Sequence, residues 1–427
     1  MMLPVDERIS EALHQIFQRM KVDEISTTCK VDATIIKFGN KLCSKHANND
    51  DQTKYISNKL RELGRLAIKM KSLDEVSCLS EVINPALFPK VVNAVLEMCG
   101  WDSVKKKVKT PSLGIKLGQL LGKVASMVAT QAIQNGDRDL RRSAKDFITL
   151  LDTEWDDEIG KRSRTELDTR KWNKPQLIPL TEDLQTLKHH LNTIQEESMQ
   201  SLKADKFDIS AYRDLATSTL AKVIMFNRRR QGEPAKLTID QLDREQDEIN
   251  EEIKGSLSSF EEKLCSTLKR YEVRGKRGRK VPLILTLKNE EAIKILIESR
   301  DSIGVASNNQ YVFAIASNNS LNYIRGNDAL RKHVVLCDLK RPDVITSTKL
   351  RKHIATLSQL LNLEERELEM LANFLGHDIT IHREFYRLPE HTLQLAKVGK
   401  LLTMLDEGKC KEYIGKSLDD VDINLQG

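Results

Sequence analysis

Apolar residues recur at helical spacing along most of the chain. Ile9, Leu13, Ile16, Phe17 and Met20 fall at i, i+4, i+7, i+8 and i+11. A stripe with this period predicts an amphipathic helix that turns one face towards a core. The same pattern continues over 55–66, 32–46, 80–99, 113–134 and 139–158. The chain up to about residue 170 is therefore predicted to be a succession of helices.

The apolar period stops between Gly160 and Pro179, where charged residues are followed by Trp172 and Pro175. A break of this kind, with prolines in it, is typical of a boundary between domains. The sequence therefore predicts a helical domain over 1–172, a second domain over 173–405 and a polar tail over 406–427.

The second part mixes helical patterns with strand patterns. Thr181 is predicted to cap a helix, with acids in its first turn, and Ile209–Met225 is a further helix. Residues 240–262 form an acidic helical stretch with nine Asp or Glu against two basic residues. The acidic stretch is interpreted as a solvated helix face, with a partner surface as the alternative.

A β-hairpin is predicted after the acidic stretch. Arg270–Val273 and Val281–Leu287 have strand character, and a Gly-Lys-Arg-Gly turn at 275–278 separates them. Tyr311–Ala316 is a candidate further strand. From Thr348 onward the pattern is helical again and ends in an apolar stripe over 393–405, which is predicted either to dock on a neighbouring protomer or to pack on its own domain.

Composition narrows the fold class. Of 427 residues, 40% are hydrophobic, 30% charged and 5% aromatic, with 19 Gly and 10 Pro. So few glycines and prolines, which interrupt helices, favour long helices. We therefore expect a mainly α protein with a small β-sheet (α+β), and an all-β fold is excluded. No run approaches the roughly 20 apolar residues of a membrane helix, and the N-terminus has no signal-peptide pattern. No membrane association is expected.

The cysteines indicate neither disulfides nor a metal site. Seven are scattered without close pairing, and an odd number is typical of reduced thiols in the cytosol or nucleus. Cys43 and His46 lie three apart, but no second ligand pair follows at zinc-finger spacing. No metal is predicted.

Basic residues are clustered, although the net charge is only +6. Seven lie between Lys269 and Lys280 against one acid, Glu272. Such clusters are candidates for contacts with DNA phosphates, and the alternative is a solvated face or a nuclear-import signal. The candidate contacts are Arg228, Arg229, Arg274, Arg277, Arg279, Lys280, Lys105, Lys106 and Lys107. A nuclear location is expected.

Four further features carry chemistry only when they are taken together. They are Arg230-Gln-Gly-Glu233, the lysine of Gly275-Lys276-Arg277-Gly278, Leu350-Arg351-Lys352-His353, and Leu375-Gly376-His377 followed nine residues later by Tyr386. A carboxylate one turn after Arg230 can hold the guanidinium in a fixed plane.

In this order and spacing the four features resemble the tyrosine recombinases, the phage-integrase family, whose catalytic set is Arg, Lys, His-x-x-Arg, His or Trp, and Tyr. The amino-acid sequence at 226–233 and 375–389 is most similar to that of eukaryotic Crypton-type transposon recombinases and their domesticated relatives. The resemblance covers about 175–405. The helical first part is similar only in position to the family's DNA-clamping domain.

The resemblance implies a reaction and a role for each residue. Tyr386 attacks a DNA phosphodiester and holds the 3′-phosphate, while Lys276 protonates the leaving 5′ oxygen. Arg230 and Arg351 clamp the non-bridging oxygens, so they are predicted to converge in space, and His377 donates a further hydrogen bond. The implied partners are double-stranded DNA and other protomers, in a dimer or tetramer. Neither a metal nor another cofactor is implied.

One position departs from the family pattern. Thr348 stands three residues before Arg351, where the family usually has His, and Lys349 and His353 are the alternatives for that role. Lys280 is the rival of Lys276 as the general acid. The sequence therefore leaves two main functions open, a recombinase for transposon integration or excision and a weak or inactive domesticated DNA-binding or chromatin protein. A type IB topoisomerase is a third and less similar possibility.

Overall fold

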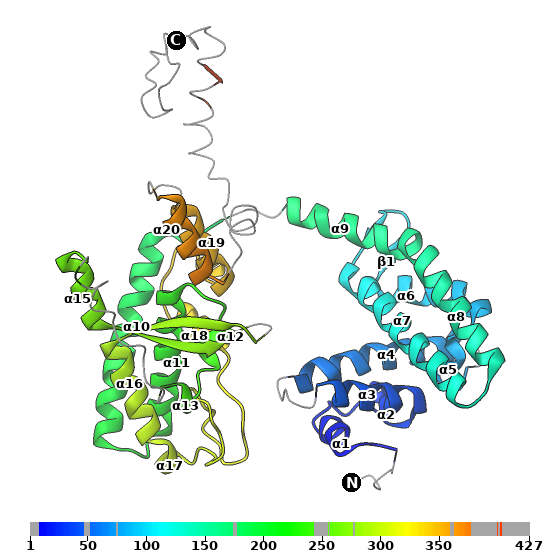
Figure 1. Ribbon diagram of the computed structural model, residues 1–427, viewed down its shortest axis with the longest axis horizontal. Helices are drawn as coiled ribbons and strands as arrows, with labels where there is room; N and C mark the ends of the chain where they lie inside the picture. Colours follow the sequence, from blue (N-terminus) through cyan, green and yellow to red (C-terminus); the bar gives the residue numbers. More distant parts are fainter. Residues whose placement is uncertain are drawn as a thin grey trace. The chain divides into compact units, whose positions relative to one another are not determined.

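The computed structural model describes residues 8–46, 52–73, 76–173, 177–242, 255, 257–275, 278–358, 363–376, 399 and 402–403. The chain divides into two compact units, Met1–Pro175 and Gln176–Gly427. Helices dominate both units, and each unit holds one two-stranded antiparallel sheet among its described residues (Figure 1). The mainly α, α+β fold class expected from composition is confirmed.

Unit 1 is helical, as the apolar period predicted. Its elements are α1 (Glu11–Gln18), α2 (Glu24–Val31), α3 (Ala33–Lys45), α4 (Thr53–Leu73), α5 (Leu79–Val82), the 3₁₀ turn η2 (Pro85–Leu87), α6 (Phe88–Met98), β1 (Trp101–Asp102), β2 (Lys107–Val108), α7 (Pro111–Gln134), α8 (Arg138–Thr153), the π-helical turn η3 (Asp156–Gly160) and α9 (Lys161–Trp172).

Helix α7 forms the centre of unit 1. It packs against α3, α4, α6, α8 and α9. Leu117, Leu120, Leu121 and Val124 are fully buried there, and each such side chain contributes about 2 kcal/mol of hydrophobic free energy. The core of unit 1 therefore follows from the apolar face that the sequence placed on this helix.

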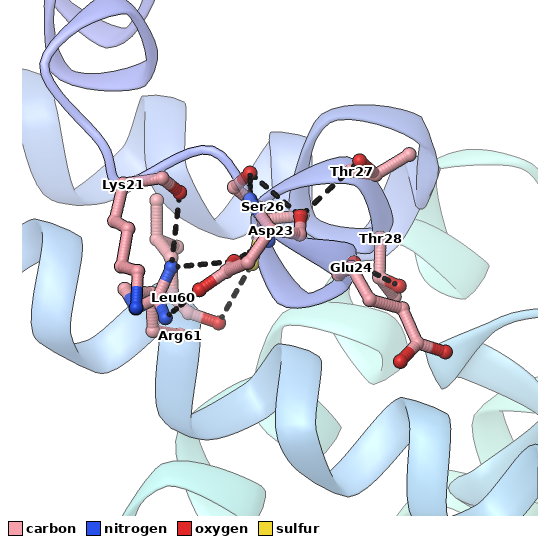
Figure 2. Close-up of polar contacts among 9 residues, drawn as sticks. Lys21, Asp23, Glu24, Ser26, Thr27, Thr28, Leu60 and Arg61 are labelled. Atoms are coloured by element: carbon pink, nitrogen blue, oxygen red, sulfur yellow. Dashed lines mark hydrogen bonds and ion pairs between the residues drawn. The ribbon is translucent and has the colours of Figure 1, made fainter.

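An ion pair fastens the start of α2 to α4 (Figure 2). Arg61 donates from Nη1 and Nη2 to the two carboxylate oxygens of Asp23, at 2.9 and 2.6 Å. Asp23 also caps α2, because its Oδ1 accepts from the Ser26 N–H at 2.9 Å. The hydrogen bond with Arg61 and the backbone contact lower the pKa of Asp23 to about 2. This carboxylate therefore stays charged and holds both helices at neutral pH.

Unit 2 contains the elements that carry the four chemical features. They are α10 (Thr181–Ala204), α11 (Ile209–Asn227), α12 (Gly232–Ala235), α13 (Ile239–Leu242), α15 (Ser259–Thr267), β3 (Leu268–Arg274), β4 (Lys280–Thr286), α16 (Leu287–Glu298), α17 (Arg300–Ile303), α18 (Gly326–Val335), the 3₁₀ turn η5 (Pro342–Val344), α19 (Ser347–Leu357) and α20 (Glu365–Phe374).

Helix α11 is the axis of unit 2. Most of its residues are buried, and it packs against α10, α16, α18, α19 and β4. Tyr212, Leu215, Leu220 and Ile224 are fully buried along it. The arginine triplet Arg228–Arg230 follows directly after this rigid element, so the fold fixes where the triplet begins.

The predicted hairpin is confirmed. Strands β3 and β4 pair in antiparallel register from Leu268 opposite Thr286 to Arg274 opposite Lys280. On β4 the side chains of Val281, Leu283 and Leu285 are buried, and the residues between them are less so. This alternation is the pleat of a sheet with one face on a core. Gly275, Gly278 and Arg279 accordingly lie at the tip of the hairpin.

Helix α9 continues to Trp172, in line with the helices predicted up to about residue 170. Two local predictions were wrong. The N-cap of α10 is Leu180, which makes no side-chain cap, and Thr181 is the first helical residue. Tyr311–Ala316 forms only two isolated bridges, Thr238 to Tyr311 and Ala314 to Tyr323, and no strand.

Other predictions fall largely outside the described residues. This holds for 243–254 and 256 in the acidic stretch, and for the 393–405 stripe except 399, 402 and 403. In the part of the chain that the structure describes, no helix is long and apolar enough to span a bilayer. The same residues contain no cluster of metal-binding side chains, and their six cysteines are free thiols.

A histidine pair joins α10, α11 and α18. The Thr217 hydroxyl donates to the Arg213 carbonyl at 2.8 Å, so it accepts from His333 Nε2 at 3.1 Å. Nδ1 of His333 then carries no proton and accepts from His190 Nε2 at 3.2 Å. His333 is 1% exposed. Burial, the charge of Lys332 and the neighbouring His190 lower the pKa of His333 to about 4.

Stability is therefore expected to fall on acidification. Below pH 6.5 the unfolded chain binds a proton at residue 333 that the folded chain refuses until about pH 4. The loss from His333 reaches about 3 kcal/mol between these values. Urea unfolding at pH 7.5 and 4.5 measures it. His333→Gln should reduce the pH dependence by that amount, whereas His189→Gln, at an exposed neighbouring position, should retain it. An unchanged pH dependence in His333→Gln would refute this assignment.

Candidate functional site

The arginine triplet turns sharply at the end of α11. Arg228 adopts a left-handed conformation with φ +52° and closes the helix through its N–H, which donates to the Ile224 carbonyl at 3.0 Å. This conformation costs a non-glycine residue about 1–2 kcal/mol. The next two arginines therefore leave the helix axis, and the three side chains have different environments. Arg228 is half-buried, Arg229 is fully buried and the side chain of Arg230 is 33% exposed.

One buried carboxylate holds two of these arginines. Arg230 Nη1 lies 3.4 Å from Glu233 Oε1, which is the contact that the sequence predicted. Arg229 Nε lies 3.1 Å from Glu233 Oε2, a contact that the sequence did not reveal. Glu233 is only 5% exposed. Among the described residues, Arg228–Arg230 therefore bring three positive charges to one ion-paired carboxylate, which favours an anion nearby.

The structure brings the Leu375-Gly376 turn to the same place. The guanidinium of Arg229 lies over the Phe374 ring, 5.2 Å from its centroid. Gly376 has φ +73°, and a Cβ on it would lie 3.1 Å from Arg229 Nη2 and 3.3 Å from Arg230 Nη1. The positive φ favours glycine there, and a Cβ would also displace both guanidinium groups slightly. The Arg230–Glu233 feature and the Leu375-Gly376 feature are therefore in contact, although they lie more than 140 residues apart in sequence.

Helix α19 adds the third feature. It packs against α11, and Arg351 and His353 on it are each 6% exposed. Burial and the positive charge of Arg228 lower the pKa of His353 to about 4, so His353 is neutral at pH 7. The convergence of Arg230 and Arg351 on one phosphate stays a prediction, supported by this placement of α19 next to the triplet.

Thr348 and Lys349 have different surroundings. Thr348 is exposed and lines an open groove of about 710 Å³ between α18 and the start of α19. Lys349 donates from Nζ to the Leu177 carbonyl at 2.5 Å. Thr348, Lys349 and His353 are the candidates for the role of the missing histidine. His353 is the one that is buried and lies beside an arginine, Arg228.

A residue without a predicted functional role anchors the hairpin to the triplet. The Asn227 amide donates to the Ile284 carbonyl at 2.8 Å and accepts from the Ile284 N–H at 2.7 Å. This amide mimics a neighbouring strand and ties β4 to the residue before Arg228. Its signal in the sequence is a polar side chain that follows the apolar run Val223–Phe226 at the end of a helix.

The hairpin tip presents basic residues to solvent. Arg274, Arg279 and Lys280 are exposed, and Lys280 Nζ lies 3.0 Å from Glu272 Oε2. The Gly275 N–H donates to the Arg279 carbonyl at 2.8 Å across the turn. Lys276 and Arg277 lie outside the described residues, as do His377 and Tyr386, so their roles stay predictions.

A second basic tip lies in unit 1. Lys105, Lys106 and Lys107 are exposed at the β1–β2 turn, where Asp102 Oδ1 accepts from the Val104 and Lys105 N–H groups at 3.0 and 2.9 Å. Helix α9 braces this hairpin. Arg162 lies over the Trp101 ring at 5.1 Å and Arg170 donates to the Val108 carbonyl at 2.6 Å.

Comparisons with known proteins find similarity only in solved structures, because no family model and no curated protein matches the chain. One similar structure is the XerH site-specific recombinase bound to palindromic difH substrate, a post-cleavage complex, with 15% identity, a TM-score of 0.38 and coverage of 86% of this chain and 94% of that chain. Another is the pre-cleavage complex of XerH with difH substrate, with 15% identity, a TM-score of 0.38 and coverage of 88% and 93%.

Proposed function

We propose that this chain is a site-specific DNA recombinase that cleaves and rejoins DNA through a 3′-phosphotyrosine intermediate on Tyr386. The observation that carries the proposal is the contact of the Arg228–Glu233 segment with Gly376, next to α19 with Arg351. This contact brings together the segments that carry Arg230, Arg351 and Gly376. Their positive guanidinium groups outnumber the carboxylate of Glu233, which suits the binding of a DNA phosphate.

The chemistry follows from what a phosphodiester needs. The Tyr386 hydroxyl, with a reference pKa of about 10, attacks phosphorus and passes its proton to a base, for which neutral His353 is the candidate among the described residues, and the bond to the 5′ oxygen breaks. Lys276 gives a proton to that oxygen, with Lys280 as the rival donor. Arg230 and Arg351 stabilise the charge on the non-bridging oxygens, and His377 adds a hydrogen bond. The bond energy is kept in the phosphotyrosine, so rejoining needs no external cofactor.

The proposal extends to partners and origin. The two basic hairpin tips, with Lys105–Lys107 in unit 1 and Arg274–Lys280 in unit 2, contact the DNA backbone. The amino-acid sequence at 226–233 and 375–389 supports a Crypton-type transposon recombinase or a domesticated relative that acts in the nucleus. Recombination joins two duplexes, so the protein self-associates on DNA.

A second candidate is a relative that binds DNA without turnover. The observation in its favour is Thr348, which is exposed where the family usually has histidine and cannot serve as a base at neutral pH. His353, neutral and buried beside Arg228, favours turnover instead, because an imidazole with a free lone pair can accept a proton.

One experiment separates the two candidates. The full chain is incubated with nicked or bubble-containing duplexes from the ends of the element that encodes it, and a denaturing gel is examined for covalent adducts. A recombinase gives a protein–DNA adduct whose linked peptide contains Tyr386. Retarded duplexes in a native gel without any adduct support the binding protein, and an adduct on a serine or aspartate refutes the proposed chemistry.

Gly376→Ala is expected to impair the site beyond its effect on the fold. Its Cβ would press on two guanidinium groups, which then shift by a few tenths of an ångström. We expect cleavage to slow about tenfold, since catalytic groups tolerate little displacement. The matched control is Gly304→Ala, at φ +77° with nothing within 4 Å of its Cβ. Both variants should lose about 1–2 kcal/mol of stability. Equal cleavage rates for the two would contradict the placement of Gly376.

A further inference from the structure

We propose that Arg229 is a positioning residue. By occupying one oxygen of Glu233, it keeps that carboxylate from enclosing Arg230 and leaves Arg230 donors for a phosphate oxygen. This role rests on the proposed function, in which Arg230 is a phosphate clamp. It replaces the expectation that Arg229 itself contacts DNA, because its side chain is 0% exposed.

The geometry of the shared carboxylate is the first argument. A carboxylate can accept two parallel hydrogen bonds from a single arginine, and such a bidentate pair is strong. Each oxygen of Glu233 instead contacts a different arginine. Oε2 lies 3.1 Å from Arg229 Nε, and Oε1 lies 3.4 Å from Arg230 Nη1. Arg230 is thereby oriented by one long contact rather than neutralised by two. Its side chain stays 33% exposed, so a ligand can reach it.

The energetics of Arg229 are the second argument. Its Nη1 and Nη2 are buried and have no hydrogen-bond partner among the residues that the structure describes. The Phe374 ring gives a cation–π contact at 5.2 Å, which is a weak substitute for hydrogen bonds. Burial lowers the pKa of Arg229, yet arginine stays charged in proteins. An apolar side chain of similar length would fill the same space without a buried, half-satisfied charge.

The third argument concerns the packing around Arg229. Phe374 and Gly376 close over the guanidinium, so its position depends on the turn that leads to His377. Arg229 thus contacts Glu233 on one side and this turn on the other. Arg230 also lies beside Gly376, so a displacement of the turn would reach Arg230 both directly and through the carboxylate. Of the two arginines that touch Glu233 and this turn, Arg229 is the fully buried one.

The central test is Arg229→Met, a change that keeps length and removes the charge. We expect the melting temperature of the full chain to stay unchanged or to rise by a few degrees, since a costly buried charge is lost. Cleavage at saturating DNA should slow about tenfold, because Glu233 then encloses Arg230. Adding Glu233→Gln to Arg229→Met should restore most of the rate. A merely structural arginine predicts the opposite, since the second change would add to the damage.

A readout independent of cleavage separates this proposal from the proposed function. The coupling between Arg230 and Glu233 is measured by thermal unfolding of Arg230→Met, Glu233→Gln and their combination. In the Arg229→Met background this coupling should grow, so that Arg230→Met lowers the melting temperature by a few degrees more than it does in the original chain. Arg228→Met is the matched control, because Arg228 makes no described contact with Glu233, and it should leave the coupling unchanged.

Each outcome decides the proposal. If the original chain forms no adduct but the coupling grows in Arg229→Met, the proposed function fails and the role of Arg229 towards Glu233 stands. Unchanged coupling overturns the proposal whether or not the chain cleaves DNA. A cleavage rate in Arg229→Met equal to the original also overturns it, as does an unfolded Arg229→Met chain. Arg229→Lys, which keeps the charge with a single donor group, should give an intermediate cleavage rate.

Discussion

Tyr386→Phe is expected to abolish covalent attachment to DNA. The variant lacks the hydroxyl that would form the phosphotyrosine bond, and no other tyrosine of the chain lies at the family's spacing from Leu375-Gly376-His377. Affinity for duplex DNA should change by less than about twofold, because contacts with backbone phosphates dominate such binding. A denaturing gel for adducts and a native gel for binding, run on the same preparation, give both values.

The matched control is Tyr55→Phe in unit 1. Tyr55 is 42% exposed, and its ring lies beneath Lys59 Nζ at 4.7 Å, a contact that phenylalanine preserves. This variant should form adducts at the original rate. An adduct that persists in Tyr386→Phe would mean that another nucleophile acts, and the assignment of the tyrosine would then be wrong even if the recombinase proposal held.

The helices and the hairpin were predictable because their signals are local. The apolar period of 9–20 and 113–134 fixes a buried face without knowledge of its partner, and α1 and α7 follow it. Gly275 and Gly278 supply the turn between two strand-like runs, and Gly278 has φ +75°. Such features depend on residues within one turn or one hairpin, which is the range over which a sequence pattern is informative.

Helix α9 lies within the part predicted to be helical, but the apolar period did not indicate its bounds, because distant residues stabilise it. Its sequence is charged on all sides and has no apolar stripe. The contacts that hold it are Arg162 over Trp101 and Arg170 with the Val108 carbonyl, about 60 residues away. An apolar period does not record contacts of this kind.

The candidate site shows the same limit. The spacing of Arg230 and Glu233 predicted their contact, since three residues make one helical turn. Nothing in three consecutive arginines tells which is buried. That depends on the left-handed turn at Arg228 and on Phe374, which packs there from a distant helix. The sequence therefore indicated the contact of Arg230 with Glu233 but not the division of roles within the triplet.

Glu233→Gln is expected to have the largest effect on stability among changes at the site. The substitution keeps shape but removes the charge that compensates Arg229, which is fully buried. Breaking a buried pair by removing one partner costs about 3–5 kcal/mol, because the remaining charge stays desolvated. Urea unfolding at pH 7.5 should show this loss. Combining it with Arg229→Met should recover most of it, since the uncompensated charge is then gone as well.

Glu272→Gln on the hairpin is the matched control for burial. Glu272 also binds two cations, with Arg270 Nη2 at 3.1 Å and Lys280 Nζ at 3.0 Å, but all three side chains are substantially exposed. Solvent screens such pairs, so this variant should lose less than about 1 kcal/mol. Equal losses for the two glutamates would mean that burial does not set the strength of the Glu233 pair. The distinction drawn here between Arg229 and Arg230 would then lose its energetic basis.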